Sequence, residues 1–392
     1  MDIVARAQEQ ADSVVGLARE LVRLPSRGGI DDYEPVLRHV QAWLAEQGLA
    51  YRRLLGPDGG CVGLLVEVEG GRPGSWWTLD ACLDTAPFGD EDAWSFSPTS
   101  GAVVDGWLLG RGAADSKLAA SLFCHIAADV QREAAGLAGG LSVLLDVDEH
   151  TGAFGGARAF LADARAHRPS GVMIGYPGFD ELVVGGRGLW RAVVSVFAPA
   201  GHSGSRKKVA NAISRAARLV QLLDAVPLPE ADDRFPLPGK LTVTSISGGS
   251  GWSVTPGRVD LNVDVRLTPA LDGQAAAGLV RGAVARLDAE LPPPAPTEVV
   301  EKVCWPPFQL AAEEEPAAAM FRAAGVLGVD ITARTAGPSN IGNLLASHDV
   351  PATAGFGIPY EGLHGTDERA HLAELPLVHA LYHRAVLDLL RG

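Results

Sequence analysis

The stretch Asp105-Gly-Trp-Leu-Leu-Gly-Arg-Gly-Ala-Ala-Asp-Ser-Lys117 places an acidic residue and a lysine between a short apolar run and the start of a helical pattern. Three further segments have the same character: Leu79-Asp-Ala-Cys-Leu-Asp-Thr-Ala-Pro-Phe-Gly-Asp90, Asp146-Val-Asp-Glu-His-Thr-Gly-Ala-Phe-Gly-Gly156 and Gly362-Leu-His-Gly-Thr-Asp-Glu368. Each puts an acidic residue, His or Cys where a strand gives way to a loop, the usual position for sites in open α/β sheets. The four segments therefore predict one site on an α/β fold.

The sequence around these segments predicts the sheet and its helices. Residues from about 2 to 50 have apolar positions at helical spacing, and a helix is expected at about 117 to 134. Short apolar runs at Val62 to Val68, Trp76 to Asp80 and Leu141 to Val147 are typical of buried strands. Strands that alternate with helices indicate a mostly parallel sheet with helices on both faces.

The segment from 190 to 302 has a different order of elements. We expect strand Arg191 to Phe197, helix Ala210 to Leu223, strands Leu241 to Ile246 and Arg258 to Leu267, helix Gly273 to Leu287 and strand Thr297 to Val303. This β-α-β-β-α-β order predicts a separate α+β unit. Because helix, strand and helix follow it, we predict an α/β catalytic domain of residues 1–189 and 303–392 into which residues 190–302 are inserted.

Length and composition agree with two domains and exclude several classes of protein. At 392 residues the chain is too long for one ordinary core. Its net charge of -14 disfavours nucleic acid and anionic membrane surfaces as partners. The chain has no signal-like start and no run of about 18 apolar residues, so a cytoplasmic enzyme is expected. Its four cysteines form no CxxC pair, which argues against a zinc knuckle.

In order and spacing, the four segments resemble the signature of the zinc-dependent aminoacylase and exopeptidase family, which includes acetylornithine deacetylase, succinyl-diaminopimelate desuccinylase and carboxypeptidase G. That signature runs His-x-Asp-Thr-Val-Pro, then Asp-Gly-x-Leu-x-Gly-Arg-Gly-x-x-Asp-x-Lys, then Asp-Glu-Glu and a late His-x-x-x-Glu. The likeness covers nearly the whole chain, and Gly201-His-Ser-Gly204 looks like the histidine motif of the family's inserted dimerisation domain. It implies a homodimer formed through residues 190–302 and a small amino-acid-like substrate.

The resemblance also implies five metal-ligand positions, which are Cys82, Asp115, His150, Tyr176 and His364. In the family, two zinc ions share the aspartate that corresponds to Asp115. Here Cys82 stands where a histidine belongs, Tyr176 where a carboxylate belongs and His150 where a glutamate belongs. A phenol replaces a carboxylate poorly, although a thiolate at Cys82 could still bind zinc. Asp115, His150 and His364 remain a sound three-ligand set, so we expect at most one zinc ion per subunit, and none if the site has been rebuilt for other chemistry.

The same resemblance assigns catalytic residues. Glu149 occupies the position of the general base, which takes a proton from the attacking water and passes it to the leaving nitrogen. His202 corresponds to a histidine that reaches the partner's active site and stabilises the oxyanion. Asp84, in the segment Leu79–Asp90, is the third expected catalytic residue. Arg266 is the candidate to bind a carboxylate group of the substrate.

Two further positions are expected on the substrate side. Tyr176 follows Ile174-Gly175, and Asn340 ends a Gly337-Pro-Ser-Asn340 segment where the family has Gly-Thr-Ser-Asp. In isolation, residues such as Cys82, His150 and Tyr176 would more often be buried or capping residues than functional ones. His371, His379 and His383 look like helix-face residues, and no motif supports a role for them.

Three hypotheses follow. The first is an amidohydrolase that acts on an N-acylated amino acid or small peptide, with one zinc ion and Glu149 as base. The second is a metal-independent enzyme of the same fold, used for condensation, cyclisation or acyl transfer, in which Cys82 could act as a nucleophile although no base is assigned to it. The third is a binding protein that has kept the cleft without the chemistry.

Overall fold

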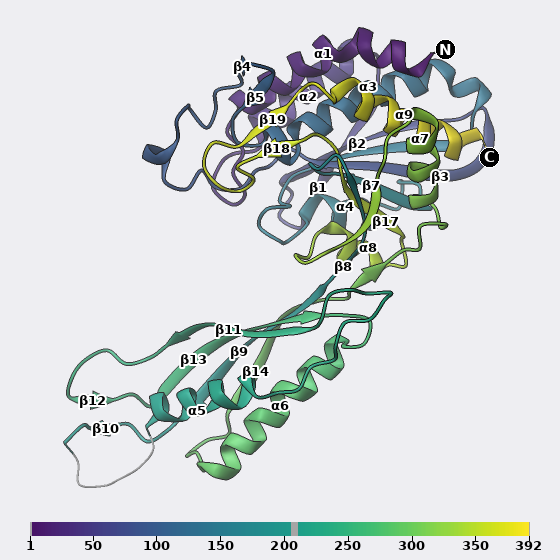
Figure 1. Ribbon diagram of the computed structural model, residues 1–392. Coiled ribbons are helices and arrows are strands. Elements are labelled where there is room, and N and C mark those ends of the chain that lie inside the picture. The colour runs from purple at the N-terminus through teal and green to yellow at the C-terminus, as the bar shows by residue number, and fades with distance from the viewer. Residues whose placement is uncertain (1, 205–210, 392) are drawn as a thin grey trace. The chain divides into compact units, whose positions relative to one another are not determined.

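The computed structural model describes residues 2–204 and 211–391, so Ala210, the expected start of a helix, lies outside the described residues. Its contacts divide the chain into two compact units (Figure 1). The first unit comprises the residues up to Val184, Leu310–Arg334 and the residues from Asn340 onward. The second comprises Gly185–Gln309 and Thr335–Ser339. No helix in the described part of the chain is long and apolar enough to cross a membrane.

The sheet of the first unit has parallel strands at its centre. Its strands are β1 (Tyr51–Leu55), β2 (Cys61–Glu69), β3 (Arg72–Cys82), β6 (Ala138–Asp146), β7 (Gly171–Gly175), β8 (Glu181–Gly186) and β17 (Ala352–Phe356), in the order β1-β2-β6-β3-β7-β17-β8. β3 runs parallel to β6 and β7, and β17 runs parallel to β7. β1, β2 and β8 pair antiparallel toward the two edges, and β16 (Thr332–Ala336) also pairs with β8. The predicted α/β fold class is confirmed.

Helices cover both faces of this sheet. They are α1 (Ile3–Arg23), α2 (Glu34–Glu46), α3 (Leu118–Glu133), α4 (Gly155–Ala162), α7 (Ala317–Leu327), α8 (Ile341–Ala346) and α9 (Leu375–Arg391). α3 and α9 pack on β3 and β6, with α1 and α7 against them, whereas α4 packs on β1, β2 and β6 from the opposite side (Figure 1). The apolar residues at helical spacing in α1, such as Val14, Leu17 and Leu21, are buried in the core that this layer shares with the sheet.

Short strands form a separate sheet that includes the start of the segment Asp105–Lys117. β18 (Tyr360–Glu361), β19 (Arg369–His371), β5 (Trp107–Leu109) and β4 (Val103–Val104) pair antiparallel in that order. His371 therefore lies in a strand, and the expectation that it belongs to a helix is wrong, because β19 pairs with β5 before α9 begins. His379 and His383 lie in α9, as expected.

The second unit has the predicted β-α-β-β-α-β order. β9 (Gly188–Phe197), α5 (Ala212–Asp224), β11 (Lys240–Ser247), β13 (Arg258–Leu267), α6 (Gly273–Glu290) and β14 (Glu298–Trp305) follow one another, with short strands β10 (Gly201–His202), β12 (Val254–Thr255) and β15 (Phe308–Gln309) between or after them. Its sheet is antiparallel with the order β11-β13-β9-β14. Both helices pack on this sheet around a core of their own, which includes Trp190, Leu219 and Val263.

Candidate active site

Three parallel strands of the first unit end at one edge of the sheet. β3 ends at Cys82, which lies directly opposite Asp146 at the end of β6, and β7 ends at Gly175. The carboxyl ends of parallel strands meet at the same edge, so the loops that follow them converge there. The residues expected at the site that follow these strands include Asp84, Glu149 with His150, and Tyr176.

Asp115 is brought to this edge by an irregular turn before α3. Gly112 adopts a left-handed conformation with φ of 84°, and a Cβ there would lie 2.7 Å from Thr85 Cγ2, so the close approach requires glycine. Asp115 has extended backbone angles within the turn Ala113–Lys117, and its peptide bond to Ser116 is cis. The turn thus presents Asp115 instead of continuing the helix through it.

The Asp115 carboxylate is the centre of the site. Its Oδ2 lies 2.9 Å from His364 Nε2 and 3.5 Å from His150 Nε2, and its Oδ1 accepts a hydrogen bond of 2.8 Å from Ser116 Oγ. Cys82 Sγ lies 3.9 Å from Oδ1. Burial alone would raise the pKa of Asp115, but the contacts with both histidines outweigh it and hold this pKa well below its usual range. Asp115 is therefore an anion at neutral pH.

Asp84 holds the turn that carries Glu149 and His150. Its two carboxylate oxygens accept the backbone N–H groups of Glu149 at 3.2 Å and of His150 at 3.0 Å, and its side chain is fully buried. Asp84 Oδ2 also lies 3.6 Å from His150 Nδ1, the ring nitrogen opposite the one that faces Asp115. His150 therefore lies between two carboxylates, and these contacts raise its pKa although burial alone would lower it.

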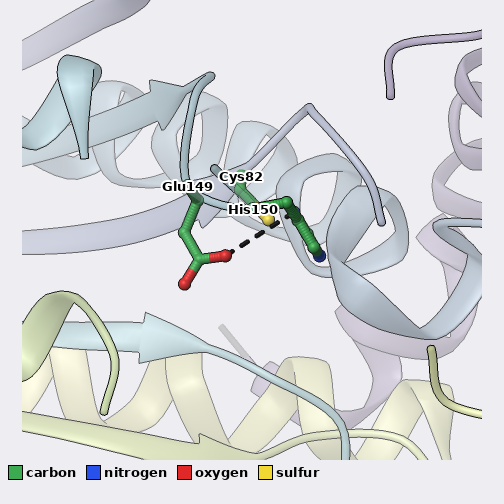
Figure 2. A group of neighbouring side chains, drawn as sticks. All are labelled: Cys82, Glu149 and His150. Atoms are coloured by element: carbon green, nitrogen blue, oxygen red, sulfur yellow. Dashed lines mark ion pairs between the residues drawn. The ribbon is translucent and has the colours of Figure 1, made fainter. Parts of the chain in front are cut away.

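Glu149 and Cys82 complete the cluster around His150. Figure 2 shows the Glu149 carboxylate turned toward His150, with an Oε2 to Nδ1 distance of 3.5 Å, and the Cys82 thiol beside the same imidazole. Burial raises the pKa of Glu149 to about 7, and the neighbouring carboxylates of Asp115 and Asp84 add to this effect. A carboxyl group that gains and loses a proton near neutral pH suits general acid–base chemistry.

Two of the three altered positions, Cys82 and Tyr176, hold neutral groups. Burial raises the pKa of the Cys82 thiol well above its ordinary value, and the Asp115 carboxylate opposes ionisation further, although His150 partly offsets this. Burial also raises the pKa of the Tyr176 phenol, and the carboxylates of Asp115 and Glu149 act in the same direction. Both groups are therefore protonated at neutral pH when no metal is bound.

The donor atoms of the site form two overlapping groups that could hold a metal ion. Asp115, His150 and His364 each offer a ligand atom within 4.8 Å of the others, and so do Cys82, Glu149 and His150. Neither ring nitrogen of His150 has a hydrogen-bond partner among the described residues, although both are buried. Two histidines and one carboxylate form a common zinc ligand set. The second group, Cys82, Glu149 and His150, shares His150 with the first.

Several buried polar groups near the site were not anticipated. Lys117 Nζ donates to the carbonyl oxygens of Leu21 and Leu24 at the end of α1, and burial lowers its pKa to about 8. Behind the strand ends, the carboxyl oxygens of Asp80 and Asp146 are buried and have no hydrogen-bond partner among the described residues. Burial raises the pKa of both, that of Asp80 to about 8. The signal for Asp80 in the sequence was an acidic residue two positions before Cys82, within the buried run Trp77–Cys82 of β3.

The remaining expected residues belong to the start of α8 and to the second unit. Asn340 begins α8, and its side-chain oxygen accepts the Gly342 N–H, so this atom serves as a helix cap. His202 and Arg266 belong to the second unit: His202 is exposed on β10, and Arg266 on β13 forms an ion pair of 2.8 Å with Asp264. The first unit therefore brings together Cys82, Asp84, Asp115, Glu149, His150 and His364 through the contacts described above.

Comparison with known proteins identifies the family to which the chain belongs. The model of peptidase family M20/M25/M40 matches residues 79–388. Succinyl-diaminopimelate desuccinylase of Parvibaculum lavamentivorans is 30% identical over 286 residues, which are 70% of this chain and 71% of that protein. Two solved structures share the fold: a tripeptidase of Staphylococcus aureus (TM-score 0.78, 18% identity, 97% of this chain and 99% of that one) and a metallo-carboxypeptidase of Sulfolobus solfataricus (TM-score 0.77, 14% identity, 95% and 98%).

Proposed function

Because the chain belongs to peptidase family M20/M25/M40, we propose that it is an amidohydrolase that removes the acyl group from an N-acylated amino acid or hydrolyses a small peptide, with a single zinc ion. The desuccinylases among its relatives support an acylated amino acid as substrate, and the tripeptidase and carboxypeptidase folds are compatible with a short peptide. The observation that carries the proposal is the position of Glu149 beside a group of two histidines and one aspartate, in which Asp115 and the His150 side chain are buried and His364 is half exposed.

In this proposal Asp115, His150 and His364 hold the zinc ion, and Cys82 stands next to them. Zinc bound there would supply Lewis-acid chemistry to the reaction. Asp84 keeps the His150 ring in place through its contact with Nδ1 and through the backbone of the same turn. Carboxylate partners of this kind commonly orient histidine ligands and strengthen them.

Glu149 acts as the general base and then as the general acid. Its carboxylate accepts a proton from the attacking water as the water oxygen bonds to the substrate carbonyl carbon. When the carbon–nitrogen bond breaks, the same proton passes to the leaving nitrogen, so that an amine and a carboxylic acid are released. A pKa of about 7 lets Glu149 accept and return the proton at neutral pH.

Residues of the second unit and the substrate side complete the proposal. Arg266 binds a substrate carboxylate, His202 donates to the oxyanion in the active site of the partner subunit, and Tyr176 and Asn340 contact the substrate. The protein is then a homodimer formed through the second unit. Light scattering should give the mass of a dimer at micromolar concentration, and a monomer would contradict the proposed role of His202.

A metal-independent enzyme of the same fold is the second candidate, and the surroundings of His150 favour it. Asp84, Asp115 and Glu149 place carboxylate oxygens 3.5–3.6 Å from its ring nitrogens, which suits a positively charged imidazolium. Such a site could direct condensation, cyclisation or acyl transfer at a carbonyl group.

Elemental analysis of protein purified without chelator tests both candidates. One zinc equivalent per chain that is lost in His150→Ala supports the single-zinc hydrolase. Two equivalents would contradict our account of the altered ligands. An active enzyme without metal would replace the first candidate by the second.

A further inference from the structure

Glu368 is a fully buried carboxylate four residues after His364 in the sequence. Its Oε1 accepts the backbone N–H groups of Gly112 at 3.0 Å, Ala114 at 3.1 Å and Asp115 at 3.3 Å. These donors belong to the irregular turn that presents Asp115. One oxygen of Glu368 therefore fixes the backbone on which the central carboxylate of the site is carried.

The other oxygen of Glu368 is linked to the His364 loop by hydrogen bonds through Arg111. Arg111 Nη1 donates to Glu368 Oε2 at 2.5 Å, and Nη2 donates to the carbonyl oxygen of Gly365 at 2.7 Å. Gly365 is the residue after His364, so the guanidinium holds the backbone next to that ligand. The Arg111 side chain is also buried, with its guanidinium 5.2 Å from the ring centre of Trp94.

The arrangement connects segments that are about 250 residues apart in the sequence. The pairing of β19 with β5 and the bond from the Gly110 N–H to the Glu368 carbonyl oxygen also join these segments. His364 itself lies in a loop and is half exposed, so its 2.9 Å contact with Asp115 depends on how the two backbones are held. A buried ion pair contributes little net stability when it replaces apolar contacts, but it fixes geometry when its remaining donors and acceptors are paired. Both oxygens of Glu368 and both Nη atoms of Arg111 are hydrogen-bonded, whereas Arg111 Nε is buried without a partner among the described residues. The carboxylate therefore meets this condition in full and the guanidinium meets it at the two atoms that face Glu368 and Gly365.

We propose that Glu368, acting with Arg111, is a positioning residue that sets the separation of the two ligands Asp115 and His364. The inference rests on the proposed function, because it assigns these two residues to the metal. Glu368 does not touch the substrate or the ion. Its effect is on how well the ligand pair is organised before the ion binds.

Two variants separate the parts of this connection. Glu368→Gln keeps one acceptor oxygen and turns the other into a donor, so the side chain can satisfy the backbone N–H groups or Arg111 but not both. Arg111→Lys keeps the positive charge beside Glu368, yet a single ammonium cannot reproduce the forked contact with Gly365. Asp288→Asn is the matched control, because Asp288 pairs with the buried Arg215 in the second unit.

The measurement is the affinity for Co²⁺, with its visible absorption as a signature of ligand geometry. We expect Glu368→Gln and Arg111→Lys to bind Co²⁺ about 10- to 100-fold more weakly than the wild type and to change the absorption spectrum. Asp288→Asn should leave both unchanged even if its unfolding temperature falls. Either site variant that is folded and binds Co²⁺ with wild-type affinity and spectrum would overturn the proposal.

Hydrogen exchange of the metal-free proteins keeps this test separate from the proposed function. We expect the amides of residues 362–367 to exchange faster in Arg111→Lys than in the wild type and in Asp288→Asn. If the wild type binds no Co²⁺, the single-metal proposal fails, whereas unchanged exchange of this loop in Arg111→Lys would refute the positioning role itself. If Glu368→Gln does not fold, Arg111→Lys decides the question alone.

Discussion

The first unit contains two clusters of two histidines and one aspartate. Asp115, His150 and His364 form the active-site cluster, and Asp129, His379 and His383 form a second group, which we call the helical cluster. In each, the ligand atoms lie within 4.8 Å of one another. The residue types are therefore identical, and any difference in behaviour must come from position and surrounding charge.

The helical cluster lies between helices instead of at strand ends. Asp129 on α3 accepts hydrogen bonds from the guanidinium groups of Arg6 and Arg132, so two positive charges already face one carboxylate. Burial lowers the pKa of His379 to about 3, and burial also lowers the pKa of His383. These imidazoles are neutral, and a divalent ion next to them would face two arginines.

The active-site cluster has the opposite balance of charge. Asp84 and Glu149 add carboxylates around His150, and contacts with acidic neighbours raise the pKa of this histidine. Cations, whether protons or metal ions, are stabilised there. The comparison shows that the identity of the ligands does not by itself make a metal site, because the neighbouring charges decide whether a cation is attracted.

Removal of the proposed proton carrier, Glu149, should give the largest effect. We expect Glu149→Gln to lower kcat by a hundredfold or more, because the amide fills the same space but cannot carry a proton. The measurement is turnover of an N-acyl amino acid found to be a substrate, with zinc content determined on the same sample. A variant that keeps more than about a tenth of wild-type turnover would show that Glu149 is not the base.

A pair of matched substitutions tests the two clusters directly. Asp115→Asn should abolish zinc binding, since it removes the anion that both histidines share. Asp129→Asn should leave zinc binding unchanged and lower the free energy of unfolding by about 1–3 kcal/mol, because the arginines lose the negative charge and one of the two acceptor oxygens of their buried partner. Zinc content and chemical denaturation of both proteins decide this. Loss of zinc in Asp129→Asn would show that the helical cluster, and not the active-site cluster alone, binds the metal.

Substitution of Asp84, the carboxylate next to Nδ1 of His150, should have a smaller effect on zinc affinity. We expect Asp84→Asn to weaken zinc binding about 10- to 100-fold, as is usual when a partner of a histidine ligand is changed. Its amide can still accept only one of the two backbone N–H groups that Asp84 accepts, so some loss of stability should accompany it. Competition with a zinc chelator gives the zinc affinity. An unchanged affinity would show that Asp84 does not support His150 as a metal ligand.

The last prediction concerns acid stability and the helical cluster, and it leaves the active-site cluster unchanged. The pKa of His379 is about 3 in the folded protein and 6.5 when exposed, so folding disfavours the protonated form. The stability that depends on neutral His379 is therefore complete above pH 6.5 and is lost as the pH falls toward 3, by up to about 1.4 kcal/mol per pH unit. Denaturation of chelator-treated protein between pH 7 and 4 should show a shallower decline for His379→Gln than for wild type. Equal slopes would mean that His379 is protonated or solvated when folded.

Much of the fold could be predicted because it depends on local patterns. Strand β13 has the predicted limits Arg258–Leu267, and helices α5 and α6 differ from their predicted ranges mainly at the ends. Periodic burial produces such elements, and it can be recognised in a short window. Strand β1 (Tyr51–Leu55) was missed because only Leu54 in it is well buried, so an edge strand of this kind has almost no apolar signal.

The sequence by itself determined the fold family, the order of elements and the residue types that gather around Asp115, because strand ends and turn residues are encoded locally. Only the tertiary structure decided which partners they meet. Asp84 faces His150 across 66 residues, and Glu368 joins the Asp115 turn to the His364 loop across more than 250. The same holds for charge: Arg6 meets Asp129 from a distant helix, and no spacing in the sequence indicates it. Desolvation and neighbouring charge are properties of the packed chain, so they alone separate two clusters of the same composition.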